Sequence, residues 1–153
     1  RWPLKEIYAC VKKYQPSCQV GVNWTIGSPD AIDKMCLPEN QKDGFPFRFY
    51  PSDFRLGDPY LPADPDPKVF ANEGKRYYMP FETTVCLGKK WFYSTVEDPY
   101  KSLDVLAQLY KQATAQDNIL IINCPPGPDG RMRETDAKIL KELGEKLGLV
   151  NKK

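Results

Sequence analysis

A near-continuous run of apolar residues, Asn118 to Cys124 (NILIINC), lies between two segments whose apolar residues recur at helical spacing. A strand that lacks the usual alternation of polar and apolar residues is typical of a parallel sheet covered on both faces. A parallel neighbour requires a long crossover connection, and the flanking helical segments can supply it. The chain is therefore expected to form an α/β domain built on a parallel sheet.

Three segments carry the apolar stripe of an amphipathic helix. The first covers residues 4–14 and ends before Pro16. The second begins after Ser102, a good N-cap residue, with Asp104 favourably placed in its first turn. The stripes of the three predicted helices consist of Leu4, Ile7, Tyr8, Val11 and Tyr14; of Leu103, Leu106, Leu109, Tyr110 and Ala113; and of Ala137, Leu140, Leu143 and Leu147.

Two further strands are predicted, at Cys18 to Trp24 and at Arg76 to Cys86. In the second, Met79, Phe81, Thr83 and Val85 share one face, and Pro80 weakens the prediction because proline cannot donate to a ladder. The segment from Thr25 to about Lys75 has eight prolines, five phenylalanines and no sustained period, which predicts a long irregular loop. Its aromatic content indicates that this loop is ordered and packed.

The predicted order is helix, strand, loop, strand, helix, strand, helix, an alternation that favours a parallel sheet with crossover helices. Three strands are too few to close a barrel. Two interpretations remain open: a small open α/β domain, or a partial (β/α)8 TIM barrel holding only its C-terminal strands and helices. Because the chain starts at Arg1 and a helical pattern follows at once, we expect residues 1–153 to be a fragment of one domain.

Composition excludes several classes of function. A net charge of +2 from 22 basic and 20 acidic residues gives no electrostatic footprint for nucleic acid. No stretch approaches the ~20 apolar residues of a membrane span. The five cysteines show no CxxC spacing and the chain has no histidine, which argues against a structural zinc site and excludes Ser-His-Asp and Cys-His centres. Most cysteines are expected to be small buried apolar residues.

Carboxylate chemistry remains, and Glu82 is the acid that differs from the others. It lies within a predicted strand among apolar residues, where burial would raise its pKa and suit it to act as a general acid. The alternative is a buried glutamate paired with a Lys or Arg. Trp91 and Tyr93 follow this strand and Trp24 ends another; such aromatic residues can line a sugar site or belong to the core.

Three blocks of the sequence together resemble the α-L-fucosidases, glycoside hydrolase family 29. They are YYMPFETTVCLGKKWFY (Tyr77 to Tyr93), the helix from Ser102 to Ala115, and DNILIINCPPGPDGRM (Asp117 to Met132). The last block is similar to the family motif Leu-Leu-Asn-x-Gly-Pro-x-x-Asp-Gly without a gap. The resemblance covers the second half of the chain, and residues 4–23 more loosely.

The resemblance implies the C-terminal part of a catalytic (β/α)8 barrel that hydrolyses terminal α-linked L-fucose with retention. It implies Glu82 as the general acid/base, Trp91, Tyr93, Trp24 and Asn23 as sugar-binding residues, and Asn123 as a hydrogen-bonding support at a strand end. Fucosylated oligosaccharides are the implied substrate, no metal or other cofactor is needed, and the implied location is secreted or periplasmic. The remainder of the barrel would come from a missing N-terminal part.

Three departures from the family pattern accompany the resemblance. The Trp-x-Asp-Gly segment that carries the nucleophile is absent, so the nucleophile is expected outside this chain and the chain alone is expected to be inactive. The sugar-binding histidines are absent as well. The family's Asn-x-Arg element reads Asn23, Trp24, Thr25 here, so Arg48 or Arg55 would have to replace its arginine. A catalytically dead fucose-binding barrel and an unrelated small α/β interaction domain stay open as alternatives.

Overall fold

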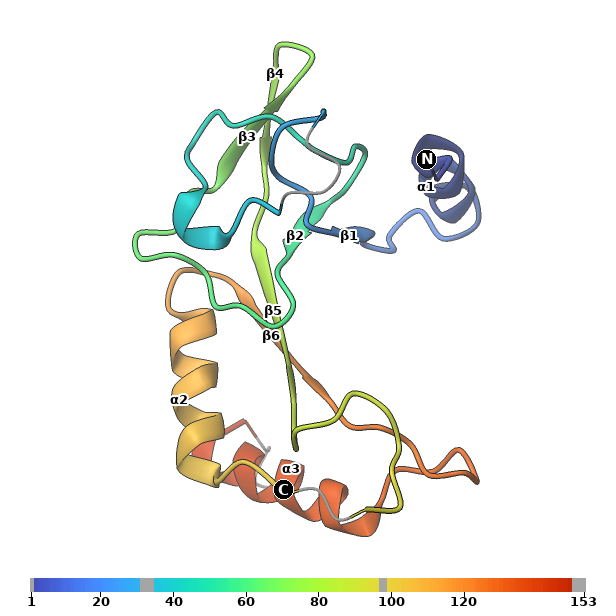
Figure 1. Ribbon diagram of the computed structural model, residues 1–153, viewed down its shortest axis with the longest axis vertical. Coiled ribbons are helices and arrows are strands. Elements are labelled where there is room, and N and C mark those ends of the chain that lie inside the picture. The colour runs from blue at the N-terminus through green and yellow to red at the C-terminus, as the bar shows by residue number, and fades with distance from the viewer. Residues whose placement is uncertain (1, 31–34, 97–98, 150–153) are drawn as a thin grey trace.

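The computed structural model describes residues 2–30, 35–96 and 99–149. Figure 1 shows an elongated molecule, with β5 and β6 running along its middle, the other strands at one end, and α2 and α3 at the other. The helices are α1 (Leu4–Tyr14), α2 (Leu103–Thr114) and α3 (Glu134–Leu147), and a 3-10 turn covers Pro38–Asn40. The strands are β1 (Gly21–Asn23), β2 (Phe54–Leu56), β3 (Val69–Asn72), β4 (Lys75–Tyr78), β5 (Phe81–Cys86) and β6 (Ile119–Asn123).

The main sheet has four parallel strands in the order β1-β2-β5-β6, which confirms the predicted α/β class with a parallel sheet. Its register pairs Asn23 with Leu56 and Leu56 with Glu82. Glu82 in turn pairs with Ile119 at the start of β6. Because residues paired across parallel strands point to the same face, these four side chains share one face of the sheet.

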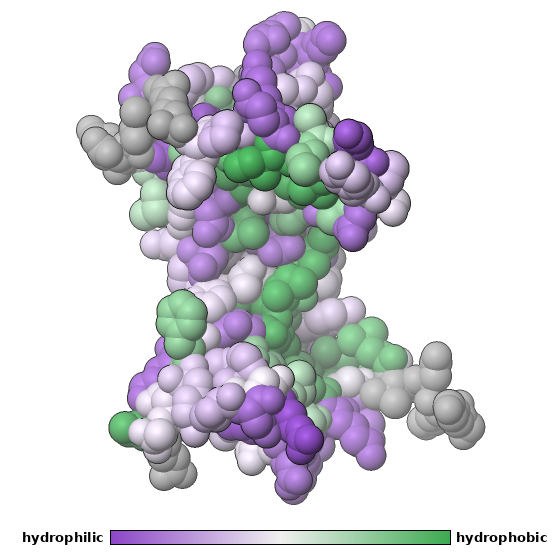
Figure 2. Space-filling model, turned by 90° about the vertical axis from the view of Figure 1, so that its right-hand side faces the viewer, coloured by the Kyte–Doolittle hydropathy of each residue, from purple (hydrophilic) through white to green (hydrophobic). Residues whose placement is uncertain are grey.

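The two faces of the sheet have different surroundings. Phe81, Thr83 and Val85 of β5 point to a buried face, as their spacing predicted. On the opposite face Ile119 and Ile121 are each 43% exposed, so the prediction that this strand is covered on both faces is wrong. The reason is that α2 and α3 pack on one side of β6 only. Figure 2 shows hydrophobic side chains gathered in the hollowed middle of the molecule.

All three predicted helices are present. The Ser102 hydroxyl accepts a hydrogen bond from the Val105 amide at 3.3 Å and so caps α2 as expected. The apolar stripes of α2 and α3 meet in a core beside β6, whose buried members are Leu87, Leu106, Ala107 and Leu143. In contrast, α1 buries no residue, and polar contacts of Tyr8 and Lys12 with Asp53 hold it.

The segment predicted to be an irregular loop contains more regular structure than expected, although its residues 31–34 lie outside the described residues. It includes β2, β3 and the first residue of β4. These strands have only three or four residues each, too short for a visible alternation. The predicted packing is confirmed, because Ile26, Phe47, Phe70 and Met79 form a second buried core.

The single strand predicted from Arg76 to Cys86 is divided in two at Met79 and Pro80. The antiparallel partner of β4 is β3, whereas β5 belongs to the parallel sheet. Pro80 cannot donate a ladder hydrogen bond, yet its carbonyl accepts one from the Arg55 amide at 2.9 Å. The strand predicted to end at Trp24 stops at Asn23, because Trp24 has a left-handed φ of 59°.

A buried ion network joins β2 to the segment that follows it. The guanidinium of Arg55 forms two hydrogen bonds with Asp66, at 2.8 and 3.0 Å, and both side chains are at most 1% exposed. Lys68 and Asn118 also donate to Asp66. Burial alone would raise the pKa of Asp66, but these donors outweigh it and hold that pKa below its usual value.

Two expectations about cysteines and membranes can be compared with the structure. Cys86 alone of the five cysteines is buried, so the expectation that most are buried is wrong; Cys10 is exposed on α1. The five cysteines are free thiols. Among the described residues, no helix combines the length and the apolar character that crossing a membrane requires.

Candidate active site

The open face of the sheet forms a cavity of about 580 Å³ around Glu82. Strands β1, β2, β5 and β6, the turn after β2, the loop after β5 and helix α1 all contribute to its lining. The polar or aromatic lining residues are Tyr8, Asn23, Asp58, Glu82, Thr84 and Trp91, and the aliphatic ones include Leu4, Ile7, Leu56 and Ile121.

The strand register explains how Glu82 comes to lie in this cavity. Phe81 and Thr83 are fully buried on the helix-covered face, so the alternation of β5 turns the residue between them to the open face. Leu56 pairs with Glu82 on one side and with Asn23 on the other. Asn23 and Glu82 therefore flank the same aliphatic side chain.

The carboxyl group of Glu82 is half-buried, and burial raises its pKa, an effect that one hydrogen bond reduces. That bond comes from the Thr84 hydroxyl, which donates to Glu82 Oε1 at 3.2 Å. Among the described residues no Lys or Arg forms an ion pair with Glu82, so the structure gives no support to the alternative of a glutamate paired with a Lys or Arg. Burial therefore makes this carboxyl group easier to protonate than a solvated carboxylate, as a general acid requires.

Trp91 reaches the cavity from the loop that follows β5, and Asn123 fixes that loop. The Asn123 side-chain amide donates to the Trp91 carbonyl at 2.9 Å. A backbone hydrogen bond also joins the start of this loop to the end of β6, because the Leu87 amide donates to the Asn123 carbonyl at 3.0 Å. This confirms the expectation that Asn123 is a hydrogen-bonding support at a strand end.

Two predicted sugar-binding residues lie outside this cavity. Tyr93 lines a separate depression with Tyr100 and Arg133. Trp24 packs edge-on against Tyr60, with ring centroids 5.4 Å apart. The structure thus brings together Glu82, Trp91 and Asn23 but neither Tyr93 nor Trp24.

Neither arginine suggested as a replacement for the Asn-x-Arg element reaches the cavity. Arg55 is 1% exposed and belongs to the ion network on the opposite face of the sheet. Arg48 lines a different groove, beside Phe49. The suggestion that Arg55 serves the site is wrong, because its position in β2 turns it away from the Glu82 face.

Asp58 is a site residue that the sequence analysis missed. It lines the cavity with Glu82, and its Oδ1 atom is buried with no hydrogen-bond partner among the described residues. Burial raises its pKa. The available signal was an acidic residue two positions after a strand end, but the strand itself, β2, was not recognised.

The two acidic residues of the cavity share a bias toward the protonated form, because burial raises the pKa of both. Such groups can protonate a leaving oxygen or donate to a hydroxyl. An anionic nucleophile needs the opposite environment, one that keeps a carboxylate ionised. Within the described residues, this cavity therefore holds two acidic groups, Asp58 and Glu82, that burial biases toward the protonated form, beside the side chain of Trp91.

Comparison with known proteins adds independent findings. The family described as Alpha-L-fucosidase matches residues 6–152 of this chain. Alpha-L-fucosidase 1 of Arabidopsis thaliana is 28% identical over 86 residues, which are 54% of this chain and 17% of that protein. The chain thus spans about a sixth of that relative's length.

Solved structures show the same fold. The alpha-L-fucosidase isoenzyme 1 from Paenibacillus thiaminolyticus has a TM-score of 0.63 at 19% identity, covering 96% of this chain and 30% of that chain. The Thermotoga maritima alpha-fucosidase in complex with fucose has a TM-score of 0.54 at 20% identity, covering 95% of this chain and 25% of that chain. At these identities the likeness concerns the fold, and the chain spans less than a third of either structure.

Proposed function

The chain belongs to the alpha-L-fucosidase family, and from that premise we propose that it forms the acid/base half of an exo-glycosidase that removes terminal α-L-fucose from oligosaccharides. The observation that carries this proposal is the position of Glu82. Its carboxyl group is half-buried in a cavity of about 580 Å³, has a raised pKa and lies among Asn23, Thr84 and Trp91.

We propose further that the four-stranded sheet is a section of a (β/α)8 barrel. The helix-covered face would be the outside of this barrel, and the Glu82 face its interior. The 43% exposure of Ile119 and Ile121 supports this assignment, because the remaining strands of a closed barrel would cover both side chains. The rest of the barrel would come from polypeptide beyond this chain, and the chain alone would be inactive.

The reaction would proceed with retention in two displacements. As the bond between fucose C1 and the leaving oxygen breaks, Glu82 gives its proton to that oxygen, and an external aspartate forms an ester with C1. The Glu82 carboxylate then takes a proton from water while that water attacks C1 and releases the aspartate. Both proton transfers use one carboxyl group, and neither requires a metal.

Asn23 and Trp91 have separate roles in this proposal. The indole of Trp91 offers a flat apolar surface to the methyl group and C–H bonds of fucose. The Asn23 amide offers both a donor and an acceptor to ring hydroxyls. Support for both roles is that these side chains line the same cavity as Glu82.

The proposal is tested by replacing Glu82 with glutamine in a polypeptide that supplies the rest of the barrel. Glu82→Gln is expected to slow cleavage of alkyl and sugar fucosides by roughly 10²–10⁴-fold, because their leaving oxygen needs a proton. Formation of the ester from an activated aryl fucoside should change far less. Equal losses on both substrates would remove Glu82 from the acid role.

Glu145→Gln provides the matched control. Glu145 lies exposed near the end of α3, away from the residues that line the cavity. The same chemical change there should leave both rates unchanged. A comparable loss in Glu145→Gln would show that the effect of Glu82→Gln is not specific to the cavity.

A further inference from the structure

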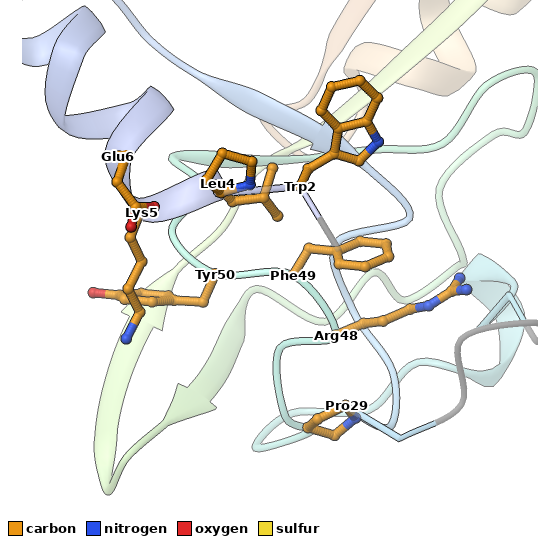
Figure 3. Close-up of a pocket in the computed structure, with 9 residues that line it drawn as sticks. Trp2, Leu4, Lys5, Glu6, Pro29, Arg48, Phe49 and Tyr50 are labelled. Atoms are coloured by element: carbon orange, nitrogen blue, oxygen red, sulfur yellow. The ribbon is translucent and has the colours of Figure 1, made fainter.

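A second hollow adjoins the Glu82 cavity. This groove, of about 430 Å³, runs between the first turn of α1 and the segment that precedes β2, and Figure 3 shows the side chains that line it. Leu4 lines both hollows, and the adjacent residues Tyr50 and Pro51 line one each. The groove therefore adjoins the cavity in which the terminal fucose is proposed to bind.

We infer that this groove binds the sugar residues to which the fucose is attached. The inference rests on the proposed function and extends it to the remainder of the oligosaccharide. A substrate whose terminal residue enters the Glu82 cavity must place its next sugars outside that cavity. The groove meets the edge of the cavity at Leu4, and its volume of about 430 Å³ has room for a sugar ring.

The chemistry of the lining suits an uncharged sugar. Trp2 and Phe49 offer flat faces on which the C–H surface of a pyranose can stack. Polar groups also line the groove: Figure 3 shows the Lys5 and Tyr50 side chains on one side of Phe49 and the Arg48 guanidinium on the other. Flat apolar surfaces with hydrogen-bonding groups at the edge match the faces and hydroxyls of a sugar.

The floor of the groove is held in place before any ligand binds. The amides of Arg48 and Phe49 both donate to the Thr25 carbonyl, at 2.7 and 3.1 Å. The Arg48 guanidinium lies 4.9 Å from the centroid of the Phe49 ring. A rigid floor lowers the entropy that binding must overcome.

Tyr50 completes the floor in a fixed orientation. Its ring packs edge-on against Phe47, with centroids 5.4 Å apart, and its hydroxyl lies 3.1 Å from that of Tyr77. The hydrogen bond with Tyr77, together with burial, raises the pKa of Tyr50 to about 12. The phenol is therefore neutral at physiological pH.

Trp2 is the wall residue best suited to a test. Its side chain is 82% exposed, so removing it leaves no cavity in a core. Phe92 is 85% exposed and belongs to neither hollow, which makes Phe92→Ala a matched control. The three tryptophans also act as reporters, because Trp2 lies in the groove, Trp91 lies in the Glu82 cavity and Trp24 lies in neither.

The experiment uses a ¹⁵N-labelled polypeptide that contains this chain and completes the barrel. It is titrated with lactose, with L-fucose and with lactose that carries an α-linked fucose, and the indole N–H signals of Trp2, Trp24 and Trp91 are followed. Lactose is expected to shift the Trp2 signal, L-fucose the Trp91 signal, and the trisaccharide both. Trp2→Ala should weaken lactose binding, followed at the Phe49 amide, by roughly fivefold. Phe92→Ala should leave that binding unchanged.

The outcomes separate this inference from the proposed function. A shift of Trp91 with L-fucose but no shift of Trp2 with lactose would overturn the inference and leave the proposed function standing. A shift of Trp2 with lactose and none of Trp91 with L-fucose would support the groove and count against the Glu82 cavity. Equal weakening by Trp2→Ala and Phe92→Ala would show nonspecific contact and overturn the inference.

Discussion

The amide of Gly57 donates a hydrogen bond to the carbonyl of Glu82 at 3.1 Å. This bond joins the turn after β2 to β5 at the level of the candidate site. The ring of Phe81 lies against the Cα of Gly57 and occupies the space that a Cβ would need. The close approach places Asp58, the next residue, in the same cavity as Glu82.

Gly57→Ala should destabilise the protein, because the added methyl group overlaps the buried Phe81 ring. Overpacking of this kind costs about 1–3 kcal/mol, measurable as a lower urea midpoint. Phe81→Leu removes the ring, so the cost of Gly57→Ala should shrink in the double variant. Additive costs in this cycle would show that the ring is not what excludes the Cβ.

Asp66→Asn should destabilise the protein at neutral pH by about 3–5 kcal/mol, because it leaves the buried Arg55 without its anionic partner. The pKa of Asp66 is lower in the folded state, so its contribution is fully present above the unfolded pKa of ~3.9 and disappears as pH falls through the folded pKa. Urea unfolding between neutral and acidic pH measures this.

Asp129→Asn is the control for the acid dependence, since its side chain is 62% exposed. It should keep the steep acid loss of stability that the wild-type chain shows. Asp66→Asn should show a flatter acid limb. Parallel curves for the wild-type chain and Asp66→Asn would contradict the assignment of acid sensitivity to the buried network.

Glu82→Gln is expected to change stability with the opposite pH dependence. Burial raises the pKa of Glu82, so ionisation disfavours the folded state, and stability falls as pH rises from the unfolded pKa through the folded pKa. The variant should have a higher urea midpoint than the wild-type chain at neutral pH, and this advantage should vanish at acidic pH. If Glu82→Gln instead had a lower urea midpoint than the wild-type chain at neutral pH, and this deficit vanished at acidic pH, the folded state would stabilise the ionised form of Glu82.

Asn123→Ala should loosen the loop that holds Trp91. Removing the 2.9 Å hydrogen bond to the Trp91 carbonyl costs about 0.5–1.5 kcal/mol. The Trp91 indole signal should shift and its order should fall, while the Trp2 signal stays unchanged as an internal reference. An unchanged Trp91 signal would show that other contacts position this residue.

The sequence predicted the elements whose pattern is local. All three helices have complete apolar stripes, and Ser102 carries its own capping group, so their positions follow from spacing alone. The side of β5 on which Glu82 lies follows from simple alternation. Recognition of Glu82 as the unusual acid required only that pattern and the absence of histidine.

The remaining features depend on contacts distant in the chain. The three residues of β2 form a strand because β1 and β5 lie on either side, a relation that no local period reveals. Asp58 was missed for that reason, and Arg55 was misjudged because its partner Asp66 lies eleven residues away. The strand predicted to end at Trp24 was one residue too long, because the chain turns there with a φ of 59°.

The most direct test of Glu82 as the acid/base uses Glu82→Ala, in a polypeptide that completes the barrel, with an activated aryl fucoside and azide. Without the base, the ester formed at fucose C1 should accumulate, and azide, which needs no deprotonation, should attack C1 and release the nucleophile. We predict a faster turnover with azide and an α-L-fucosyl azide product. No acceleration, or a product of the β configuration, would contradict the account.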